Sequence, residues 1–374
     1  MRVGVPSEVK RDEYRVALTE AGVREFVARG HEVIIERGAG VGSAISDAAY
    51  EAVGARLVDT ARQVWAEADL VCKVKEPIES EYELLGLHPS QVLFTYLHLA
   101  ASKSCTEALL KAGNTAIAYE TVRLTSGQLP LLTPMSEVAG RMATMQGAAH
   151  LMKSGGGRGI LISGVPGTQR AKVVVLGAGV AGFAAATMAV GLGAQVTILD
   201  RSLERLKQVD EHFAGRVQTL AASTHAIERE VLDADLVIGA VLVMGERAPK
   251  LVTNAMVKQM KPGSVLVDIS VDQGGCFEDT RPTTHSDPVF EVHSSLFYCV
   301  ANMPGAVPIT STQALSNATL PYALSLADHG WKKAVEADRA LAEGVNIVEG
   351  AVTSEPVAHA HGLSHTELAS FLGQ

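Results

Sequence analysis

The stretch from Val173 to Asp200 constrains the fold of this chain more than any other part of the sequence. It opens with the β-branched run Val173-Val174-Val175, passes through clustered glycines into an alanine-rich segment, and closes with a second β-branched run. Apolar runs of this length, bounded by glycine turns, are typical of buried parallel strands that flank a helix. The stretch therefore predicts a strand, a tight turn, a helix and a second strand.

A membrane span is the alternative interpretation, because the residues from Val173 to Leu199 carry no charge and are long enough to cross a bilayer. The internal glycines and the two β-branched runs favour the strand, turn and helix instead. The amino terminus also meets Arg2 and Glu8 before any long apolar run, which is not the pattern of a signal peptide. We therefore expect a cytoplasmic protein without a membrane partner.

The glycines of this stretch follow the spacing Gly-x-Gly-x-x-Gly, in Gly177-Ala178-Gly179-Val180-Ala181-Gly182. In such a turn the first glycine permits the tight bend, the second lets the backbone approach a pyrophosphate, and the third lets helix and strand pack closely. The pyrophosphate then lies at the positive end of the helix. The motif alone is weak evidence, but its place directly between a strand and a helix predicts a dinucleotide site. A glycine turn without a ligand is the alternative.

Asp200 ends the second predicted strand 23 residues after Gly177, where a carboxylate that binds the adenosine ribose is expected. A carboxylate there accepts hydrogen bonds from the ribose hydroxyls and repels a 2′-phosphate, which favours NAD over NADP. Arg201 and Arg205 leave NADP open as an alternative, because a nearby guanidinium could bind such a phosphate.

Short β-rich runs alternate with helix-like segments through two blocks of the chain, which predicts parallel strands joined by crossover helices. The first block covers about the first 120 residues, and the second has strands near 172–176, 195–199, 235–241 and 264–270. A chain of 374 residues exceeds what one core usually organises, and the last sixty or so are too few for a third domain. The sequence therefore predicts an α/β fold of two doubly wound, Rossmann-like domains. An NAD-binding domain (131–306) is inserted into a discontinuous substrate domain (1–130 and 307–374).

Two long helices are predicted near the domain boundaries. One begins with Ser136 as its N-cap, and the other covers Thr310 to His329. A shorter helix is predicted between Thr19, as N-cap, and Gly30, as C-cap.

Charge and cysteine usage exclude several classes of protein. The formal net charge of -9 and the lack of basic runs interleaved with aromatic residues argue against a nucleic-acid partner. The four cysteines are widely spaced, which predicts reduced thiols and neither disulfides nor structural zinc: Cys72, Cys105, Cys276 and Cys299. His359, His361 and His365 cluster near the carboxyl terminus but lack acidic ligands at a recognised spacing, so no metal site is predicted.

Four side chains are candidate catalytic or substrate-binding residues, because they lie just after predicted strands or near the ends of amino-terminal segments. Open parallel sheets form their ligand crevice at the carboxyl ends of the strands. The four candidates are Arg15, Lys75, His98 and Asp272. Each has a structural alternative. His98 could be a hydrogen-bonded core histidine, and Asp272 or the nearby Asp268 could cap a turn. Arg15 and Lys75 could be ordinary surface charges.

Over essentially its whole length the sequence resembles the alanine dehydrogenase and pyridine-nucleotide transhydrogenase family. Three segments are similar to the family's entry signature, lysine motif and dinucleotide signature: Glu13-Tyr14-Arg15-Val16-Ala17-Leu18-Thr19, Lys73-Val74-Lys75-Glu76-Pro77, and Val173 to Asp200. Asp272-Gln273-Gly274-Gly275-Cys276 and Asn302-Met303-Pro304 complete the match. Together these motifs are far more specific than any one of them.

The resemblance implies an NAD-dependent oxidoreductase that interconverts L-alanine with pyruvate and ammonium, and it implies a homohexamer. It also implies that Arg15 and Lys75 hold the substrate carboxylate and that His98 and Asp272 form the catalytic pair. Cofactor contacts are implied for the glycine motif, for Asp200 and for a further set of residues: Ser136, Arg205, Val241, Leu242, Ile269, Ser270, Val271, Arg281, Val300, Ala301, Asn302 and Met303.

Metal-bearing members of this family carry an acidic residue four positions before the histidine that corresponds to His329, and this chain has Ser325 there. The resemblance therefore gives no metal site. Alternative functions are the nucleotide-binding part of a proton-translocating transhydrogenase and an NADH-sensing module without turnover. Lysine- and saccharopine-type dehydrogenases are more distant alternatives. The presence of both His98 and Asp272 favours the amino-acid enzyme.

Overall fold

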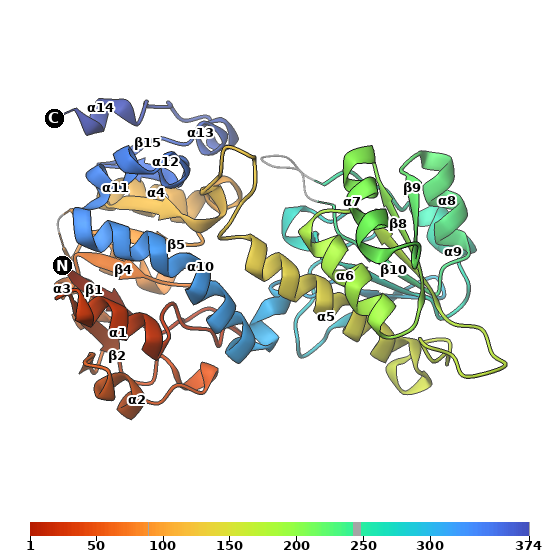
Figure 1. Ribbon diagram of the computed structural model, residues 1–374. Coiled ribbons are helices and arrows are strands. Elements are labelled where there is room, and N and C mark those ends of the chain that lie inside the picture. Colours follow the sequence, from red (N-terminus) through yellow and green to blue (C-terminus); the bar gives the residue numbers. More distant parts are fainter. Residues whose placement is uncertain (89, 242–247, 374) are drawn as a thin grey trace. The chain divides into compact units, whose positions relative to one another are not determined.

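The computed structural model describes residues 1–88, 90–241 and 248–373. The chain forms two compact units. Unit 1 comprises Met1–Pro134 and Gly305–Gln374, which are the red-to-yellow start and the blue end of the chain in Figure 1. Unit 2 comprises Met135–Pro304 and is inserted in the sequence of unit 1.

The sheet of unit 1 has the strand order β15-β14-β6-β5-β4-β1-β2-β3 within the described residues. Neighbouring strands are parallel across the sheet in the order β3-β2-β1-β4-β5-β6. At the β6 edge, β14 pairs with β6 in antiparallel orientation, and β15 pairs with β14 in the same way. The strands are β1 (Arg2–Val5), β2 (Glu32–Glu36), β3 (Arg56–Val58), β4 (Leu70–Cys72), β5 (Val92–Thr95), β6 (Thr115–Ala118), β14 (Val345–Val348) and β15 (Ala351–Val352). Leu70 is in register with both Val3 and Val92, so the central strands end at a common edge.

The helices of unit 1 are α1 (Glu20–Ala28), α2 (Asp47–Ala52), α3 (Ala61–Glu67), α4 (Lys103–Ala112), α10 (Pro308–His329), α11 (Trp331–Ala337), α12 (Arg339–Glu343), α13 (Glu355–His361) and α14 (Ala369–Leu372). Helix α1 confirms the helix predicted after Thr19, whose hydroxyl accepts a hydrogen bond from the Gly22 N–H at 3.3 Å. Trp65, Leu109 and Ile347 belong to one buried cluster. Residues far apart in the sequence therefore share the core of this unit.

The sheet of unit 2 has the order β12-β13-β11-β10-β7-β8-β9 among the strands described. Its strands are β7 (Lys172–Leu176), β8 (Gln195–Asp200), β9 (Val217–Ala221), β10 (Leu236–Gly239), β11 (Val265–Asp268), β12 (Val289–Val292) and β13 (Ser295–Tyr298). All pairs are parallel except the pair of β12 with β13. The parallel strands, read from β9 to β13, have the order of a doubly wound dinucleotide-binding domain, which reverses between β7 and β10.

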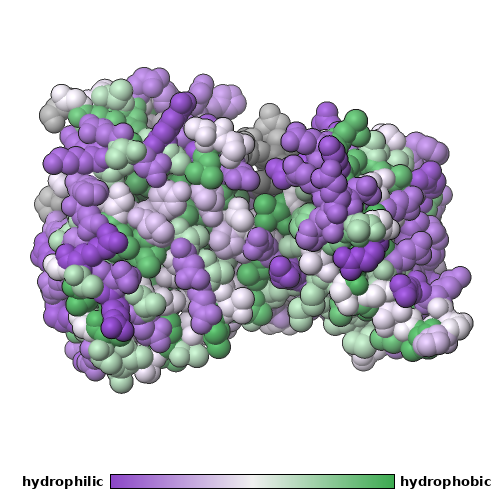
Figure 2. Space-filling view, in the orientation of Figure 1, coloured by the Kyte–Doolittle hydropathy of each residue, from purple (hydrophilic) through white to green (hydrophobic). Residues whose placement is uncertain are grey.

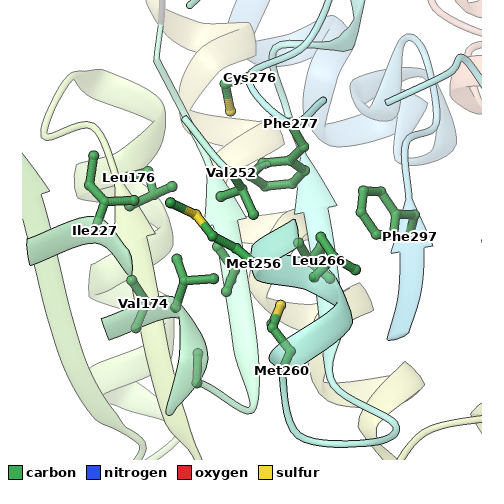
Figure 3. Close-up of a cluster of buried hydrophobic side chains, with 14 of the residues drawn as sticks. Val174, Leu176, Ile227, Val252, Met256, Met260, Leu266, Cys276, Phe277 and Phe297 are labelled. Atoms are coloured by element: carbon green, nitrogen blue, oxygen red, sulfur yellow. The ribbon is translucent and has the colours of Figure 1, made fainter. Parts of the chain in front are cut away.

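The helices that accompany this sheet are α5 (Thr133–Leu151), α6 (Val180–Gly191), α7 (Leu203–Phe213), α8 (Thr224–Leu232) and α9 (Asn254–Gln259). Figure 3 shows part of the core, in which Val174 of β7 and Leu266 of β11 lie in one cluster with Met256 of α9 and Phe297 of β13. Helix α7 buries Leu206 and other apolar residues on one face, and Figure 2 shows mainly hydrophilic residues over its outer face. The polar and apolar residues of this helix thus separate as expected for a helix on a sheet.

The strand, turn, helix and strand predicted between Val173 and Asp200 are confirmed as β7, α6 and β8. The membrane span considered for this stretch is wrong, because the stretch is divided between two strands of one sheet and a helix of 12 residues. Of the helices that the structure describes, none is long and apolar enough to cross a membrane.

The N-cap predicted at Ser136 is also wrong. Helix α5 begins at Thr133, so Ser136 lies in its first turn. The chain enters this helix through a turn in which the N–H groups of Leu132 and Thr133 both donate to the Leu129 carbonyl. Pro134 fits the first turn because N–H groups there have no intrahelical partner. Helix α10 begins at Pro308, before the predicted Thr310. A proline is favoured at the start of a helix for the same reason, because its missing N–H group would have no partner there.

Candidate active site

Two glycines of the 177–182 turn are required by the fold itself. Gly177 has a φ of +104°, and a Cβ atom there would lie 2.7 Å from the Ala240 carbonyl oxygen. A Cβ atom at Gly182 would lie 1.8 Å from the Gly177 carbonyl oxygen, because α6 packs directly against the turn. These are the tight bend and the close packing that the motif predicts for its first and third glycines.

Gly179 differs, because the fold does not require a glycine there. It is the N-cap of α6 with a φ of -70°, which any residue adopts, and a Cβ atom would have no described atom within 4 Å. This open space lies before the first turn of α6, whose N–H groups have no intrahelical partners. Backbone at this point can approach an anionic group closely, so the turn fits the pyrophosphate of a dinucleotide.

Asp200 connects the end of β8 to the glycine turn. Its carboxylate accepts hydrogen bonds from the Ala178 N–H at 2.6 Å and from the Ser202 N–H at 2.7 Å. The side chain is half-buried, and two backbone groups fix its negative charge beside the turn. This is where the sequence predicts a carboxylate that binds ribose hydroxyls.

A hollow of about 320 Å³ lies beside Gly179 in unit 2. Arg141 of α5 and Arg205 and His212 of α7 border it, and Phe183 of α6 contributes an apolar wall. Arg205 is exposed in the first turn of α7. Its guanidinium therefore lies near the dinucleotide turn, as the alternative of a bound 2′-phosphate requires.

The other predicted cofactor residues follow the ends of neighbouring strands. Val241 comes after β10, residues 269–271 come after β11, and residues 300–303 come after β13. Because β13, β11, β10 and β7 are consecutive parallel strands of the sheet, the segments lie at the same edge as the glycine turn. The Ser270 hydroxyl donates to the Val241 carbonyl at 2.7 Å and links two of the segments.

Two further predicted contacts lie elsewhere in the chain. The Arg281 guanidinium stands 4.0 Å from the centroid of the Phe290 ring, a cation–π distance that holds it in place. Ser136 lies in α5 and is half-buried. Leu242, which the sequence also predicts as a cofactor contact, lies outside the described residues.

Asp272 stands in a loop that is held by two charged side chains of unit 2. It belongs to the short helix η6 (Val271–Gln273) and is exposed. The buried Asp268 carboxylate accepts hydrogen bonds from three N–H groups and one hydroxyl of residues 270–280. Lys250 Nζ donates to three carbonyl oxygens of residues 274–277. Of the two acids, Asp268 therefore fixes the turn, and Asp272 projects from it.

In unit 1 the predicted charged residues gather at the carboxyl edge of the sheet. Strands β1, β4, β5 and β6 are parallel neighbours in the order β6-β5-β4-β1. The segments after β1, β4 and β5 carry the predicted Arg15, Lys75 and His98, and the segment after β6 carries Glu120, which was not predicted. Arg15 and Lys75 are only 2% and 8% exposed. The surface-charge alternative is therefore wrong for both residues.

Arg15 forms a buried ion pair with Glu13. Its Nε lies 2.6 Å from Glu13 Oε1, and its Nη2 lies 2.5 Å from Oε2, so the pair is bidentate. Burial lowers the pKa of Arg15, but the hydrogen bonds and charge of Glu13 outweigh it and raise the pKa above its ordinary value. The guanidinium is thus a fixed positive charge in the site.

His98 follows β5 in the left-handed backbone region, with φ 49° and ψ 36°. Its N–H donates to Glu120 Oε1 at 2.6 Å, and its ring stacks on Tyr96 with centroids 5.9 Å apart. The ring Nδ1 lies 3.9 Å from the same Glu120 oxygen. The side chain is 40% exposed, so the core-histidine alternative is wrong.

Sequence reasoning did not find Glu120 as a functional residue. Its carboxylate accepts hydrogen bonds from the N–H groups of both Leu97 and His98, so it fixes the backbone that carries the imidazole. A signal was present, because Glu120 follows the β-rich run at Thr115–Ala118 just as His98 follows its own strand.

Glu76 is a second functional candidate that was not predicted from the sequence, although it belongs to the lysine motif. It forms an ion pair with Lys10. Burial raises the pKa of Glu76, but the charges of Lys75, Lys10 and His98 outweigh it and lower the pKa below its ordinary value. A carboxylate with this lowered pKa keeps its negative charge among the cations of the site.

The cysteines and histidines outside this site do not form a metal centre in the described structure. All four cysteines are buried free thiols, as predicted. No group of three or more His, Cys, Asp or Glu side chains among the residues with described positions could hold a metal ion. Of the histidine cluster, His361 Nε2 lies 2.7 Å from the Leu99 carbonyl oxygen.

The doubly wound unit with its glycine turn, and the charged sheet edge of unit 1, define a dinucleotide-binding α/β protein of two units. Two family models match these parts: "Alanine dehydrogenase/PNT, N-terminal domain" over residues 4–139 and "Alanine dehydrogenase/PNT, C-terminal domain" over residues 143–355. The chain belongs to the alanine dehydrogenase/PNT family.

Individual relatives agree with this assignment. Alanine dehydrogenases of Mycolicibacterium smegmatis and Halomonas elongata are 60% and 54% identical to this chain, and each match covers 100% of both sequences. A solved L-alanine dehydrogenase superposes with a TM-score of 0.93 at 50% identity, over 97% of this chain and 99% of that chain. A transhydrogenase from Sinorhizobium meliloti gives 0.80 at 27% identity, over 95% and 99%. The predicted family and fold class are confirmed.

Proposed function

We propose that this protein catalyses the NAD-dependent oxidative deamination of L-alanine to pyruvate and ammonium, and the reverse reductive amination of pyruvate. Support comes from the full-length similarity to alanine dehydrogenases at 60% and 54% identity. The observation that carries the proposal is the gathering of Arg15, Lys75 and His98 at one sheet edge of unit 1. Two buried cations and an accessible imidazole suit a substrate that has a carboxylate and exchanges protons.

Asp200 supports NAD as the cofactor in preference to NADP. Its carboxylate is fixed by Ala178 and Ser202, so a 2′-phosphate would meet a negative charge that cannot move away without loss of two hydrogen bonds. We expect Asp200→Asn to weaken the preference for NADH over NADPH at least about tenfold, because it removes this repulsion. An unchanged preference would favour the alternative in which Arg205 decides between the two cofactors.

Arg15 and Lys75 are the proposed ligands of the substrate carboxylate. An arginine can bind a carboxylate with parallel hydrogen bonds, and Glu13 fixes the orientation of this guanidinium. Lys75 supplies a compact positive charge at the end of the neighbouring strand, β4. Together these groups would orient the α carbon of the substrate.

His98 is the proposed proton acceptor and donor. The dinucleotide, when bound, would supply the acceptor for a hydride from the substrate α carbon, and oxidation of the amine to a ketone also requires proton transfers that the protein must serve. An imidazole ring has two nitrogens that can accept or donate a proton, so it can accept protons from the ammonium group and the attacking water, then return one to the leaving amine. Glu120 and Tyr96 hold the ring and backbone of His98 for this task.

Asp272 is the proposed second catalytic residue, a carboxylate that favours the cationic amine and iminium forms of the substrate. Its loop is well suited to hold a charge, because Asp268 and Lys250 fix the backbone around it. The remaining cofactor contacts predicted from the sequence are part of the same proposal. So are the homohexamer and the cytoplasmic location, which the family resemblance supports and which sedimentation and cell fractionation would test.

Alanine-dependent reduction of NAD, followed at the NADH absorbance, tests the proposed reaction, with lysine and saccharopine as control substrates. We expect His98→Ala and Asp272→Asn each to reduce turnover at least about a hundredfold while NADH binding persists. Near-normal rates would remove these residues from the mechanism. Tight NADH binding without ammonium-dependent oxidation by any 2-oxo acid would instead identify a sensing module, and transfer to a second nucleotide would identify a transhydrogenase.

A further inference from the structure

A separate buried cluster of charges lies next to the segment that carries Lys75. It consists of Glu8, Lys73 and Glu81, whose side chains are 3%, 0% and 4% exposed. Lys73 Nζ lies 2.9 Å from Glu81 Oε1 and 3.4 Å from Glu8 Oε2. Removal of three charges from water is costly, and apolar side chains of similar volume would pack at least as well. The cluster therefore calls for a role beyond packing.

Glu8 replaces a strand partner that the sheet lacks at this point. Strand β1 ends at Val5 and is followed by Pro6, which has no N–H group. Strand β4 pairs with β1 only through Leu70 and Val71. Beyond these residues the side of the chain that faces β1 needs another acceptor for its N–H groups.

The Glu8 carboxylate supplies that acceptor. It accepts hydrogen bonds from the N–H groups of Val74 at 2.6 Å and Lys75 at 3.3 Å. On the opposite side the segment remains bonded to the β5 chain, where the Tyr96 N–H donates to the Val74 carbonyl and the Thr95 hydroxyl to the Lys75 carbonyl. The backbone of Lys75 is therefore held from both sides, and one of those sides depends on a single carboxylate.

The other two members of the cluster hold Glu8 and the end of the same segment. Glu81 Oε2 accepts a hydrogen bond from the Ile78 N–H at 3.2 Å, so the two carboxylates fix the chain before and after Glu76. Burial lowers the pKa of Lys73, but the charges of Glu8 and Glu81 outweigh it and raise the pKa. Lys73 is thus a permanent cation that ties the two carboxylates together.

We infer that Glu8, anchored by Lys73 and Glu81, is a positioning residue that sets where the Lys75 ammonium stands and hence how tightly the substrate carboxylate binds. The inference rests on the proposed role of Lys75 in substrate binding. It assigns to Glu8 no contact with substrate, because its carboxylate acts through the backbone of Lys75.

Glu8→Gln tests this role with the least disturbance. The amide nitrogen that replaces one carboxylate oxygen cannot accept from the backbone, while Lys73 keeps Glu81 as a partner and no buried charge is left alone. We expect the KM for pyruvate to rise about tenfold, because small misplacements of a binding group are costly. NADH binding should match that of the unmodified protein, because the dinucleotide turn belongs to unit 2.

Coupling to Lys75 separates positioning from a general loss of stability. The KM for pyruvate is measured for the unmodified protein, Glu8→Gln, Lys75→Ala and the double variant. If Glu8 acts through Lys75, the addition of Glu8→Gln to Lys75→Ala changes the KM by less than about twofold. If Glu8 only supports the fold, the two effects multiply, and the inference is overturned.

Glu230→Gln is the matched control, because Glu230 is also a buried carboxylate, 2.8 Å from Lys172 Nζ, and lies in unit 2. It should lower thermal stability and leave the KM for pyruvate unchanged. Should Glu8→Gln fail to fold, Glu8→Asp keeps the charge and draws the carboxylate back by one methylene, and the same cycle applies. An unchanged KM in the folded Glu8 variant overturns the inference. An unchanged KM in Lys75→Ala alone overturns the proposed function of Lys75.

Discussion

Single glycine-to-alanine replacements at positions 179, 182 and 191 separate what the fold requires from what a ligand requires. Each adds one methyl group to the same turn and helix. At Gly182 the new Cβ atom would lie 1.8 Å from a carbonyl oxygen, whereas at Gly179 and Gly191 no described atom lies within 4 Å. Gly179 borders the proposed pyrophosphate site, and Gly191 lies at the far end of α6.

The distances give the expected sizes of the effects. Cβ atoms essentially never approach closer than 3.0 Å, so Gly182→Ala must move α6 from the turn by at least about 1.2 Å. Overpacking of this kind typically costs about 1–3 kcal/mol. Gly179→Ala should change the free energy of unfolding by less than about 1 kcal/mol, because a poorer N-cap and a less flexible unfolded chain offset each other. Gly191→Ala should stabilise α6 by roughly 0.5–1 kcal/mol.

Binding of NADH should follow a different order. Gly179→Ala should weaken it at least about a hundredfold, or 2.7 kcal/mol, because the methyl group occupies the space in which backbone meets the pyrophosphate. Gly182→Ala should lose both stability and binding, and Gly191→Ala should keep wild-type affinity. Fluorescence titration with NADH and thermal unfolding measure the two quantities. Wild-type affinity in Gly179→Ala would refute the assignment of the turn, and wild-type stability in Gly182→Ala would refute the packing argument.

Three further predictions concern other parts of the chain. Glu120→Gln should lower kcat about tenfold with a smaller change in the KM for pyruvate, because the backbone N–H of His98 loses a charged acceptor. Equal changes in kcat and KM would contradict this positioning role. The cysteines of the folded protein should not react with a chromogenic disulfide reagent at about pH 8. The reason is that burial raises the pKa of three thiols to about 12 and that of the fourth well above its ordinary value. A thiol that reacts fast would contradict this prediction. Burial raises the pKa of Asp69, but its hydrogen bonds and charge interaction with Arg2 outweigh it and lower the pKa below 3.8. The Arg2–Asp69 pair therefore contributes its full stabilisation at pH values above 3.8, the ordinary pKa of an aspartate. This stabilisation is lost as the pH falls through the lowered pKa of Asp69 in the folded protein. Asp69→Asn should melt at a lower temperature than the unmodified protein near pH 7 and approach it below about pH 3.8, and a difference that is constant with pH would argue against the linkage.

Local sequence pattern was enough to predict the elements whose structure depends on neighbours in the chain. The stretch from Val173 to Asp200 carries its own strand, turn and helix signals, and the structure places β7, α6 and β8 there. Ser136 shows where such reasoning ends. A serine before an apolar run is a good N-cap, but the turn at Leu129 and the proline at 134 start the helix earlier.

A role that depends on strand order could not be predicted from the sequence, even where the residue follows a recognisable strand, as Glu120 does. Glu120 matters because β6 lies beside β5, which brings its carboxylate to the backbone of His98. Glu8 matters because β1 ends at Val5, so a side chain accepts the hydrogen bonds of the Val74 and Lys75 N–H groups in the segment that follows β4. Both facts follow from tertiary pairing, which a single sequence does not display. The burial of Arg15 and Lys75 was undecided for the same reason.

The antiparallel addition of β14 to β6 has a consequence for biosynthesis. Val345 pairs with Ile117, yet about 230 residues separate them in the chain. Ribosomes add about 5–20 residues per second, so the nascent chain carries β6 for roughly 10–45 s before its partner emerges. All of unit 2 is translated within that interval and can fold first. A ribosome that stalls before β14 has emerged would therefore leave β6 with an unpaired apolar edge, which chaperones must protect from aggregation.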